Sequence, residues 1–445
     1  MERNSFSRPA AFAAFLLLLL APLALQAQPS LGRQILTIDQ AVRLAEERNI
    51  AISLAASRVD NAGARVTSSF GTFLPQFSVN ASYNRPLTES TVYYQGIAVP
   101  GTRPDVLSAN ANASLQLFDG FSRTATYSGA QSSFNASVQD LSRERQTVGW
   151  QTRSAFLAAL RAEQLIQVRE SDLEVTRENL ARIRGLVDAG VAQSGQIYSE
   201  EASIANAELA LEQARTDAII ARQQLAFLLN TDPRTELQLS DEGLAMRLDS
   251  TEIAAARESL GSVGAMFERQ IVTRPDIQAA RLRVEAAEAQ VTVARSGYYP
   301  TLGAGIGYSW QNADEQTSSD ANFGLNFQYL LFDGFRTSEQ VQLAEAQRQT
   351  AMLEVRRLEL TAQADLQAAL AQIEGAERQV RAADRAVAAA RQNRFAADER
   401  YRAGVGTYTD FLLANAQFLS AQINQVNAVY NFRLAMYQVR YHLGE

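Results

Sequence analysis

The 445-residue sequence contains no cysteine, no lysine and a single histidine, His442. Without thiolates the protein has no disulfide, no iron–sulfur cluster and no thiolate zinc site, and one imidazole excludes a histidine-cluster metal site. We therefore expect no cofactor and no metal. With 41 basic and 48 acidic residues the formal charge is −7, so the basic surface that nucleic-acid binding requires is missing. These absences argue against an enzyme and against a nucleic-acid-binding protein.

Residues 1–27 have the pattern of a secretory signal peptide. Two arginines precede the apolar stretch Ala10–Leu20, and Leu-Gln-Ala ending at Ala27 offers a cleavage site before Gln28. The alternative is an uncleaved membrane anchor. The apolar stretch, interrupted by Pro22, is short for the roughly 20 residues that a spanning helix needs. We therefore expect an exported protein, cleaved near Ala27 and not acylated there, because no cysteine follows.

The rest of the chain is a tandem repeat of one sequence pattern. Three pairs of motifs align: the segments at Val59 and Val284, LFDGF at Leu117 and Leu331, and AGV at Ala189 and Ala403. The last two pairs share a spacing of 214 residues, whereas the first pair is 225 apart, so the first copy carries an insertion between Tyr83 and Leu117. Tandem copies predict a duplicated structural unit. We expect external loops at residues 84–106 and 311–320.

Two long proline-free segments, residues 121–188 and 335–402, predict helices about 100 Å long at 1.5 Å per residue. The second keeps an apolar 4-3 spacing through Leu366, Ile373 and Val380, and the first keeps the same frame 214 residues earlier. Such a heptad indicates coiled-coil packing. After each AGV turn a returning helix is predicted, over residues 196–229 and 410–443, so that each copy forms a helical hairpin.

Between the predicted helices, apolar residues recur at every second position. Phe77, Val79, Ala81 and Tyr83 alternate with serines and asparagines, and three further segments of about ten residues do the same. This alternation is typical of transmembrane β-barrels, although a soluble sheet with one buried face gives it too. Four strands cannot close a barrel, and an open edge is not tolerated in lipid. The chain is therefore expected to oligomerise, with two, three or four chains per ring.

The order and spacing of the motifs resemble those of the TolC-like outer membrane factor family. The resemblance covers the mature chain and rests on the repeat, both LFDGF junctions, the AGV reversals and RPDIQAA at Arg274. It implies a mainly α protein with membrane β structure: a homotrimer sharing a twelve-strand outer-membrane barrel, continued by a twelve-helix periplasmic α-barrel. It also implies a passive duct that works with a periplasmic membrane-fusion adaptor and an inner-membrane pump of RND or ABC type.

The predicted organisation has four parts. Residues 1–27 are the signal peptide, 28–230 the first repeat, 231–274 an equatorial connector and 275–445 the second repeat. The expected location is the outer membrane, in contact with its lipid and with an extension into the periplasm.

The resemblance also assigns residues. It places the adaptor-contact tips at the two helix reversals, and the periplasmic gate at Tyr401, Asp410 and Gln196. The tip residues are Gly190, Val191, Ala192, Gln193, Gly404, Val405, Gly406 and Thr407. Three copies of Asp410 around a narrow axis would favour cations. The chain departs from the family pattern at Gln196, often aspartate, at Gly406, which replaces an arginine, and at Leu413, which replaces an acid.

Simpler roles remain open for two gate residues. Tyr401 continues the heptad and could only pack, while Asp410 follows a turn and could cap the returning helix. Three functions also remain: a small-molecule efflux duct, a duct for type I polypeptide secretion, and an exported coiled-coil structural or adhesin protein without a pore. The alternating strands and the duplicated hairpins argue against the last.

Overall fold

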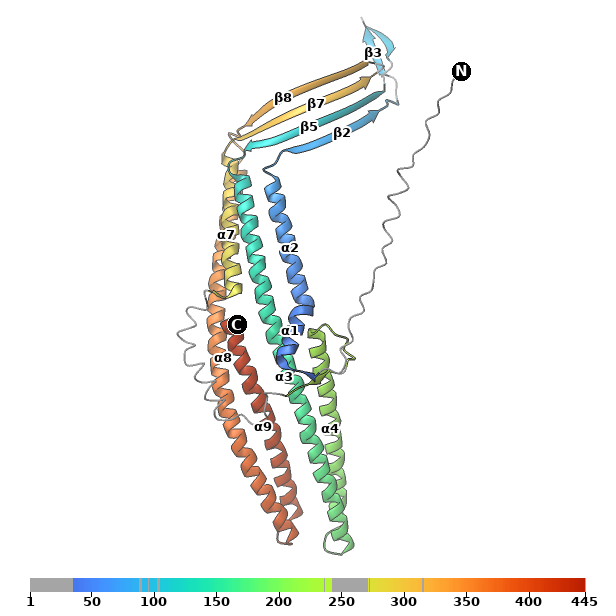
Figure 1. Ribbon diagram of the computed structural model, residues 1–445, viewed down its shortest axis with the longest axis vertical. Helices are drawn as coiled ribbons and strands as arrows, with labels where there is room; N and C mark the ends of the chain where they lie inside the picture. Colours follow the sequence, from blue (N-terminus) through green and yellow to red (C-terminus); the bar gives the residue numbers. More distant parts are fainter. Residues whose placement is uncertain are drawn as a thin grey trace, which may run out of the picture.

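The computed structural model describes residues 35–87, 90–94, 96–101, 105–235, 237–241, 271, 273–313 and 316–444. The predicted signal peptide and most of the predicted connector lie outside these residues. The protomer is elongated, with a sheet leaning away from the end of a long helical stack (Figure 1). None of the helices described is both long and apolar enough to cross a bilayer.

Four antiparallel strands form the sheet, in the order β2-β5-β7-β8. Their bounds are β2 Gln76–Asn84, β5 Val106–Phe118, β7 Thr301–Ala313 and β8 Gln316–Gln328. One hairpin comes from each copy of the repeat, and the pairing of β5 with β7 joins the copies. Since β2 and β8 occupy the two edges, each has one side without a strand partner among the described residues.

Both loop predictions are wrong in part. The insertion of the first copy contains a β-hairpin, β3 Ser90–Tyr94 paired with β4 Ile97–Gly101. In the second copy, β7 continues to Ala313 and β8 begins at Gln316, so most of residues 311–320 is strand. The apolar alternation fades at this end of the hairpin, where Asn312 opposes Thr317. The strands remain paired there, although their residues no longer alternate between apolar and polar.

The long helices begin and end close to the predicted residues. They are α3 Ser122–Asp188, α4 Gly195–Leu228, α8 Arg336–Arg402 and α9 Tyr408–Leu443. Shorter helices extend the stack toward the sheet: α1 Ile38–Arg48, α2 Ile50–Gly71, α7 Pro275–Arg295 and the 3-10 turn η1 Ser296–Tyr298. Helix α3 packs on α4, α8 packs on α9, and α3 also contacts α9, so the two hairpins lie side by side (Figure 1).

The predicted heptad seam is the buried stripe of the long helices. In α8 it is buried without a break from Ala362 to Val387, where alanines alternate with larger aliphatic residues. The aliphatic side chains pack against α9 residues such as Phe432 and Val439. Burial of one apolar stripe stabilises each hairpin through its tertiary packing, since helix propensity alone contributes little.

The LFDGF motifs turn the chain from strand into helix in the same way in both copies. In each, the glycine and the following phenylalanine adopt left-handed backbone, with φ of 70° at Phe121 and 68° at Phe335. The preceding aspartate caps the helix: Asp119 accepts from the Arg123 amide at 2.9 Å, and Asp333 accepts from the Thr337 amide at 2.8 Å.

Near the middle of the stack, the RPDIQAA segment holds the C-terminal end of α9. The Arg274 side chain, 5% exposed, pairs with Asp276 and donates from Nη1 to the His442 carbonyl at 3.0 Å. Arg143 of α3 donates to the Tyr441 carbonyl at 3.3 Å. The two guanidinium groups thus donate to carbonyls in the last turn of α9, where the Tyr441 carbonyl also accepts from the Gly444 amide at 3.1 Å. A two-residue parallel pair joins β1 Ile35–Leu36, at the start of the first repeat, to β6 Gln238–Leu239 in the predicted connector.

Candidate functional site

The two faces of the sheet differ completely in chemistry. One face carries large apolar side chains that nothing in the protomer covers: Phe77 and Val79 are each 79% exposed, and Phe327 is 68% exposed. The other face carries serine, asparagine, glutamine and glycine on all four strands. A soluble sheet would bury its apolar face, so this arrangement favours contact with lipid on one side and water on the other.

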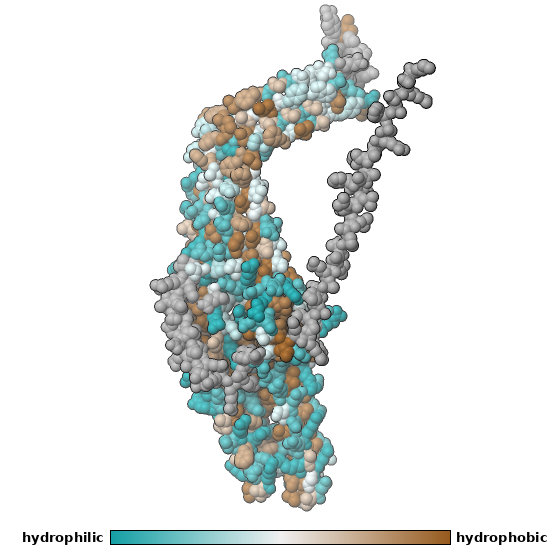
Figure 2. All heavy atoms as spheres, in the orientation of Figure 1, coloured by the Kyte–Doolittle hydropathy of each residue, from teal (hydrophilic) through white to brown (hydrophobic). Residues whose placement is uncertain are grey.

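Aromatic residues mark both ends of the apolar face. Phe121, Tyr299 and Phe335 lie exposed where the sheet joins the helices, and brown surface gathers there in Figure 2. At the far end, β7 carries Tyr308 and Trp310. From Tyr299 to Trp310 a strand rises about 36 Å, or about 26 Å along the membrane normal at a tilt of about 45°. That span matches the apolar band of an outer-membrane barrel.

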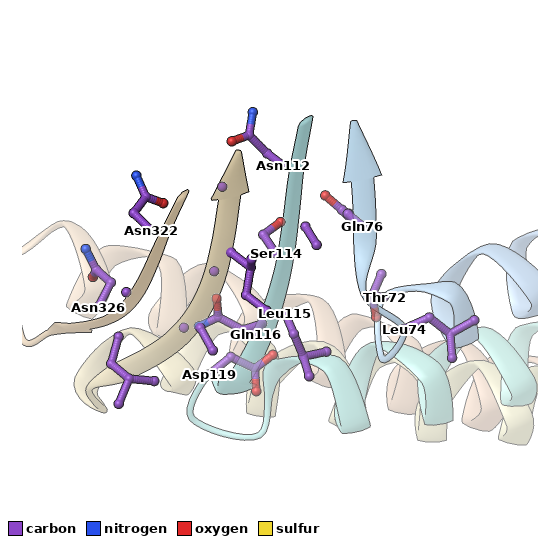
Figure 3. A pocket seen from close by; sticks show the side chains of 18 of the residues that line it. Thr72, Leu74, Gln76, Asn112, Ser114, Leu115, Gln116, Asp119, Asn322 and Asn326 are labelled. Carbon is purple, nitrogen blue, oxygen red and sulfur yellow. The ribbon is translucent and has the colours of Figure 1, made fainter. Parts of the chain in front are cut away.

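The polar face encloses a hollow of about 780 Å³ at the base of the sheet (Figure 3). Asn112, Asn322, Asn326 and Gln116 are among its lining residues. A Cβ on Gly307 would lie 2.7 Å from the Asn322 amide oxygen and 3.1 Å from that of Asn112. A side chain at residue 307 would therefore displace both amides from their positions beside this strand.

The two helix reversals end α3 and α8 with the same hydrogen-bond pattern. At the first, the Val191 amide donates to the Leu186 carbonyl at 2.9 Å, and Gly190 has φ of 71°. At the second, the Val405 amide donates to the Arg400 carbonyl at 3.0 Å, and Gly404 has φ of 73°. These are Schellman ends. The valines project into solvent, 75% and 78% exposed.

The departure at Gly406 has a steric reason. The Gly406 amide also donates to the Arg400 carbonyl, at 3.0 Å, which brings its backbone close to the end of α8. A Cβ at this position would lie 2.9 Å from Cβ of Arg400 and 3.1 Å from its carbonyl carbon. A side chain at residue 406 would therefore require this turn to shift; in the first turn the corresponding residue is Ala192, whose amide donates to the Leu186 carbonyl at a longer 3.2 Å.

Just above the tips, three polar contacts join the first hairpin to the second. Tyr401 of α8 donates to Gln196 Oε1 of α4 at 3.0 Å, and Tyr408 of α9 donates to Glu200 of α4. The third is the ion pair of Arg182 Nη1 in α3 with Asp398 Oδ1 in α8, at 2.6 Å. We call these six residues the tip joint; all four long helices contribute to it.

Aromatic rings pack around the tip joint and limit its contact with water. Tyr401 stacks on Phe411 with ring centroids 6.0 Å apart, and the Arg182 guanidinium carbon lies 5.2 Å from the Phe411 centroid. Phe411 also belongs to a buried cluster with Ile183 and Tyr408. The cation–π contact and the ion pair together hold Arg182 across the boundary between the hairpins.

Glu200 is the most buried member of the joint, with 0% exposure. Burial raises the pKa of the Glu200 carboxyl above its ordinary range, and hydrogen bonds from Tyr408 and Asn179 offset only part of this effect. Burial, followed by the bond to Glu200, also raises the pKa of the Tyr408 hydroxyl, which therefore remains a donor. The carboxyl thus holds its proton to a higher pH than an exposed glutamate does.

The structure brings only two of the three predicted gate residues together. Tyr401 bonds Gln196, whereas Asp410 forms a capping box with Thr407: its carboxylate accepts from the Thr407 hydroxyl at 2.6 Å, and its amide donates to that hydroxyl at 3.1 Å. The carboxylate also accepts from the Thr407 amide at 3.3 Å. The hydroxyl bond and, to a smaller extent, this amide bond lower the pKa of the Asp410 carboxyl. Asp410 is exposed, so the cap leaves it charged and facing water.

The chain matches the family model "Outer membrane efflux protein" over residues 41–231 and 268–445. The chain belongs to the outer membrane efflux protein family. Among curated relatives, it is 32% identical to Protein CyaE of Bordetella pertussis over 346 residues, 74% of this chain and 69% of that one. It is 23% identical to the outer membrane protein TolC of Vibrio cholerae over 404 residues, 88% of this chain and 87% of that one.

Solved channel structures share the fold. The crystal structure of the outer membrane protein VceC from Vibrio cholerae aligns with a TM-score of 0.75 and 20% identity, covering 92% of this chain and 96% of that one. The predicted fold class, mainly α with a membrane sheet built from a tandem repeat, is confirmed by this similarity and by the element order. The matching family model describes outer membrane efflux proteins, and membership in that family leaves the adhesin alternative without support.

Sequence reasoning missed Arg182, Glu200, Asp398 and Tyr408. One signal was present for Glu200, which lies seven residues before the buried Ala207 and so occupies an inward heptad position of α4. A carboxylate on an apolar seam requires a partner. Its partner, Tyr408, is 208 residues away in the sequence.

Proposed function

We propose that this protein is the outer-membrane duct of a tripartite efflux system, which passively releases drugs and other small toxic molecules to the exterior. The observation that carries the proposal is the continuity of one chain. A sheet with an uncovered apolar face and a water-compatible opposite face continues directly into hairpins of 67-residue helices, each about 100 Å long. Such a protomer is suited to carrying solutes across both the outer membrane and the periplasm.

A homotrimer is the assembly that we propose. The edge strands β2 and β8 run antiparallel to each other, because three antiparallel pairings separate them. The β8 edge of one copy can therefore pair with the β2 edge of the next and keep the alternation. Three copies would give twelve strands and remove every open edge from lipid, consistent with the resemblance to trimeric family members.

The tips are the proposed docking surface for the periplasmic adaptor, which would join the duct to an inner-membrane pump of RND or ABC type. Val191 and Val405 project from the Schellman turns, where an apolar partner surface could bury them. The tip joint lies immediately behind these turns. We assign the joint, including Tyr401 and Gln196, the role of holding the hairpins together and the entrance narrow; Asp410 would add charge at this end.

The test begins with protein purified from outer membranes in mild detergent, measuring mass and conductance on the same sample. The expected result is a particle of three mature chains, with a small, cation-favouring conductance in planar bilayers. A particle that forms no pore would overturn the proposal.

Cargo requires a second measurement in a strain that lacks its own ducts. Coexpression with an RND pump and its adaptor should restore resistance to small toxic compounds. If only polypeptide release were restored, with an ABC exporter and its passenger, the protein would instead be assigned to type I secretion.

A further inference from the structure

The water-facing side of the sheet is almost free of charge. Its side chains on β2, β5, β7 and β8 are hydroxyls, amides, glycines and a few apolar residues, and Asp320 is the sole ionisable group among them in the described strands. The register places Asp320 opposite Ser309, and Ser309 opposite Asn110, which faces Asn80. At this level of the sheet, one carboxylate therefore stands in a row of neutral side chains.

Asp320 also differs from two acidic residues that border the sheet. Asp105, beyond the outer end of β5, lies 3.9 Å from the Arg85 guanidinium, and Asp119, at the base, pairs with Arg123 at 3.0 Å. No arginine in the described part of the chain forms an ion pair with Asp320, which is exposed on strand β8. Its charge is therefore not neutralised by any residue that the structure describes.

We propose that Asp320 sets the charge preference of the barrel: it gives the outer part of the pore a preference for cationic over anionic solutes. This inference rests on the proposed trimeric duct, in which three copies of Asp320 would lie at one height. The sheet's amides and hydroxyls hydrogen-bond solutes of either sign, so they discriminate little, whereas a carboxylate ring in a narrow aqueous pore discriminates by charge. The preference would be distinct from any effect of Asp410 at the opposite end of the molecule.

Asp320 can be tested locally because the chain has no cysteine of its own. Two single reporters are introduced on the same face of β8: Asn322→Cys, two residues from Asp320, and Asn326→Cys, six residues away. Both asparagines line the hollow in Figure 3. At about 3.3 Å per residue they lie about 7 Å and about 20 Å from Asp320 along the strand. The second distance exceeds the Debye length of about 10 Å at 0.1 M salt, so Asn326→Cys is the matched control.

The reconstituted channel is treated from the outer side with cationic, neutral and anionic methanethiosulfonates, with and without Asp320→Asn. The measured quantity is the ratio of the cationic to the anionic reaction rate, in which changes of thiol reactivity common to both reagents cancel. By Coulomb's law in water at about 7 Å, Asp320→Asn should lower this ratio about three- to sevenfold at Asn322→Cys. At Asn326→Cys the change should be much smaller, and raising the salt should reduce the effect at both positions.

An unchanged ratio at Asn322→Cys after Asp320→Asn, with the neutral reagent still reacting, would overturn the role of Asp320 and leave the duct intact. An equal change at both reporters would also overturn it, because the effect would then not be local. If the neutral reagent reached neither thiol, the lumen would not open to the outside, and the proposed duct would fail together with this inference.

Discussion

The two copies of the repeat agree in their scaffold and differ where they touch. Helices α3 and α8 have the same length, begin after the same left-handed Gly-Phe step and end in the same Schellman turn. The tip joint, in contrast, uses positions at which the copies diverge. At the common spacing of 214 residues, Arg182 aligns with Ala396, Glu200 with Ala414, and Ser194 with Tyr408. Duplication thus explains the shared lengths and turns of the helices, whereas the contacts between the copies come from residues that differ between them.

The beginnings of the returning helices differ as well. Helix α9 starts with the Thr407–Asp410 capping box, whereas Ser194 at the start of α4 makes no side-chain capping bond. A cap of this kind contributes about 1 kcal/mol. The second hairpin is therefore the better fixed of the two at the tip.

The largest effect on export should come from the helix-reversal glycines, which both copies have. Replacing Gly190 and Gly404 together by tryptophan should abolish pump-dependent export while trimers persist, because bulky side chains would stand on the proposed docking surface. Export of a fluorescent substrate and native gel mobility are the measurements. Gly→Ala at both sites is the control for strain alone, since both glycines have positive φ. Export by the tryptophan variant at the level of the alanine variant would exclude the tips as the docking surface.

The next largest effect on the channel should come from Arg182, which has no counterpart in the second copy. Arg182→Leu removes the ion pair with Asp398 and the cation–π contact, so single-channel conductance should rise several-fold. Arg184→Leu is the matched control, because Arg184 pairs with Glu201 inside the first hairpin at 2.9 Å. Equal conductance in the two variants would show that the joint does not hold the entrance.

A smaller effect is expected from pH. Because burial raises the pKa of Glu200, its stabilising contribution to the joint is fully present below the ordinary carboxyl pKa and is lost as pH rises through the raised value. Wild-type conductance should therefore increase between acidic and neutral pH, and Glu200→Gln should flatten the profile. Glu201→Gln, at the exposed neighbour, should leave the profile as in the wild type. A wild-type profile preserved in Glu200→Gln would refute the assignment.

The smallest effects concern the predicted gate residues. Tyr401→Phe removes one hydrogen bond, worth about 1 kcal/mol. Asp410→Ala removes the carboxylate's half of the capping box, whereas the Thr407 hydroxyl can still accept from the residue-410 amide. The double variant should raise conductance modestly. Asp410→Asn separates the two roles of Asp410, because the asparagine amide oxygen can still accept from Thr407 but the side chain carries no charge. A loss of cation preference in Asp410→Asn would support an acidic ring, and unchanged selectivity would leave only the cap.

The sequence predicted the helices well because proline, glycine and heptad spacing are local signals. The second long helix was expected over 335–402 and spans Arg336–Arg402. The outer ends of the strands were missed because Asn312 and Thr317 are polar on the face that is apolar further down, so the alternation disappears although pairing continues. The β3–β4 hairpin in the insertion was likewise predicted as a loop.

The site was less predictable, for a different reason. Tyr401 and Gln196 were identified from the family resemblance, and their contact joins residues 205 apart in sequence. Nothing local to Arg182 or Asp398 shows that they will meet, because which faces of two hairpins come together depends on the packing of all four helices. Asp410 illustrates the converse: its bonding partner, Thr407, is three residues away, and the capping alternative was readable from the turn itself.

The divergence at the tip joint constrains how such a molecule could be simplified. A shortened gene encoding only the first repeat could still supply hairpins for a ring of six identical units, since each repeat contains two strands and a helical hairpin. Every bond of the joint, however, takes one partner from each repeat. A six-fold ring of identical units would lack all three bonds, so a duct built from half of the sequence would lose the contacts that we propose hold its entrance narrow.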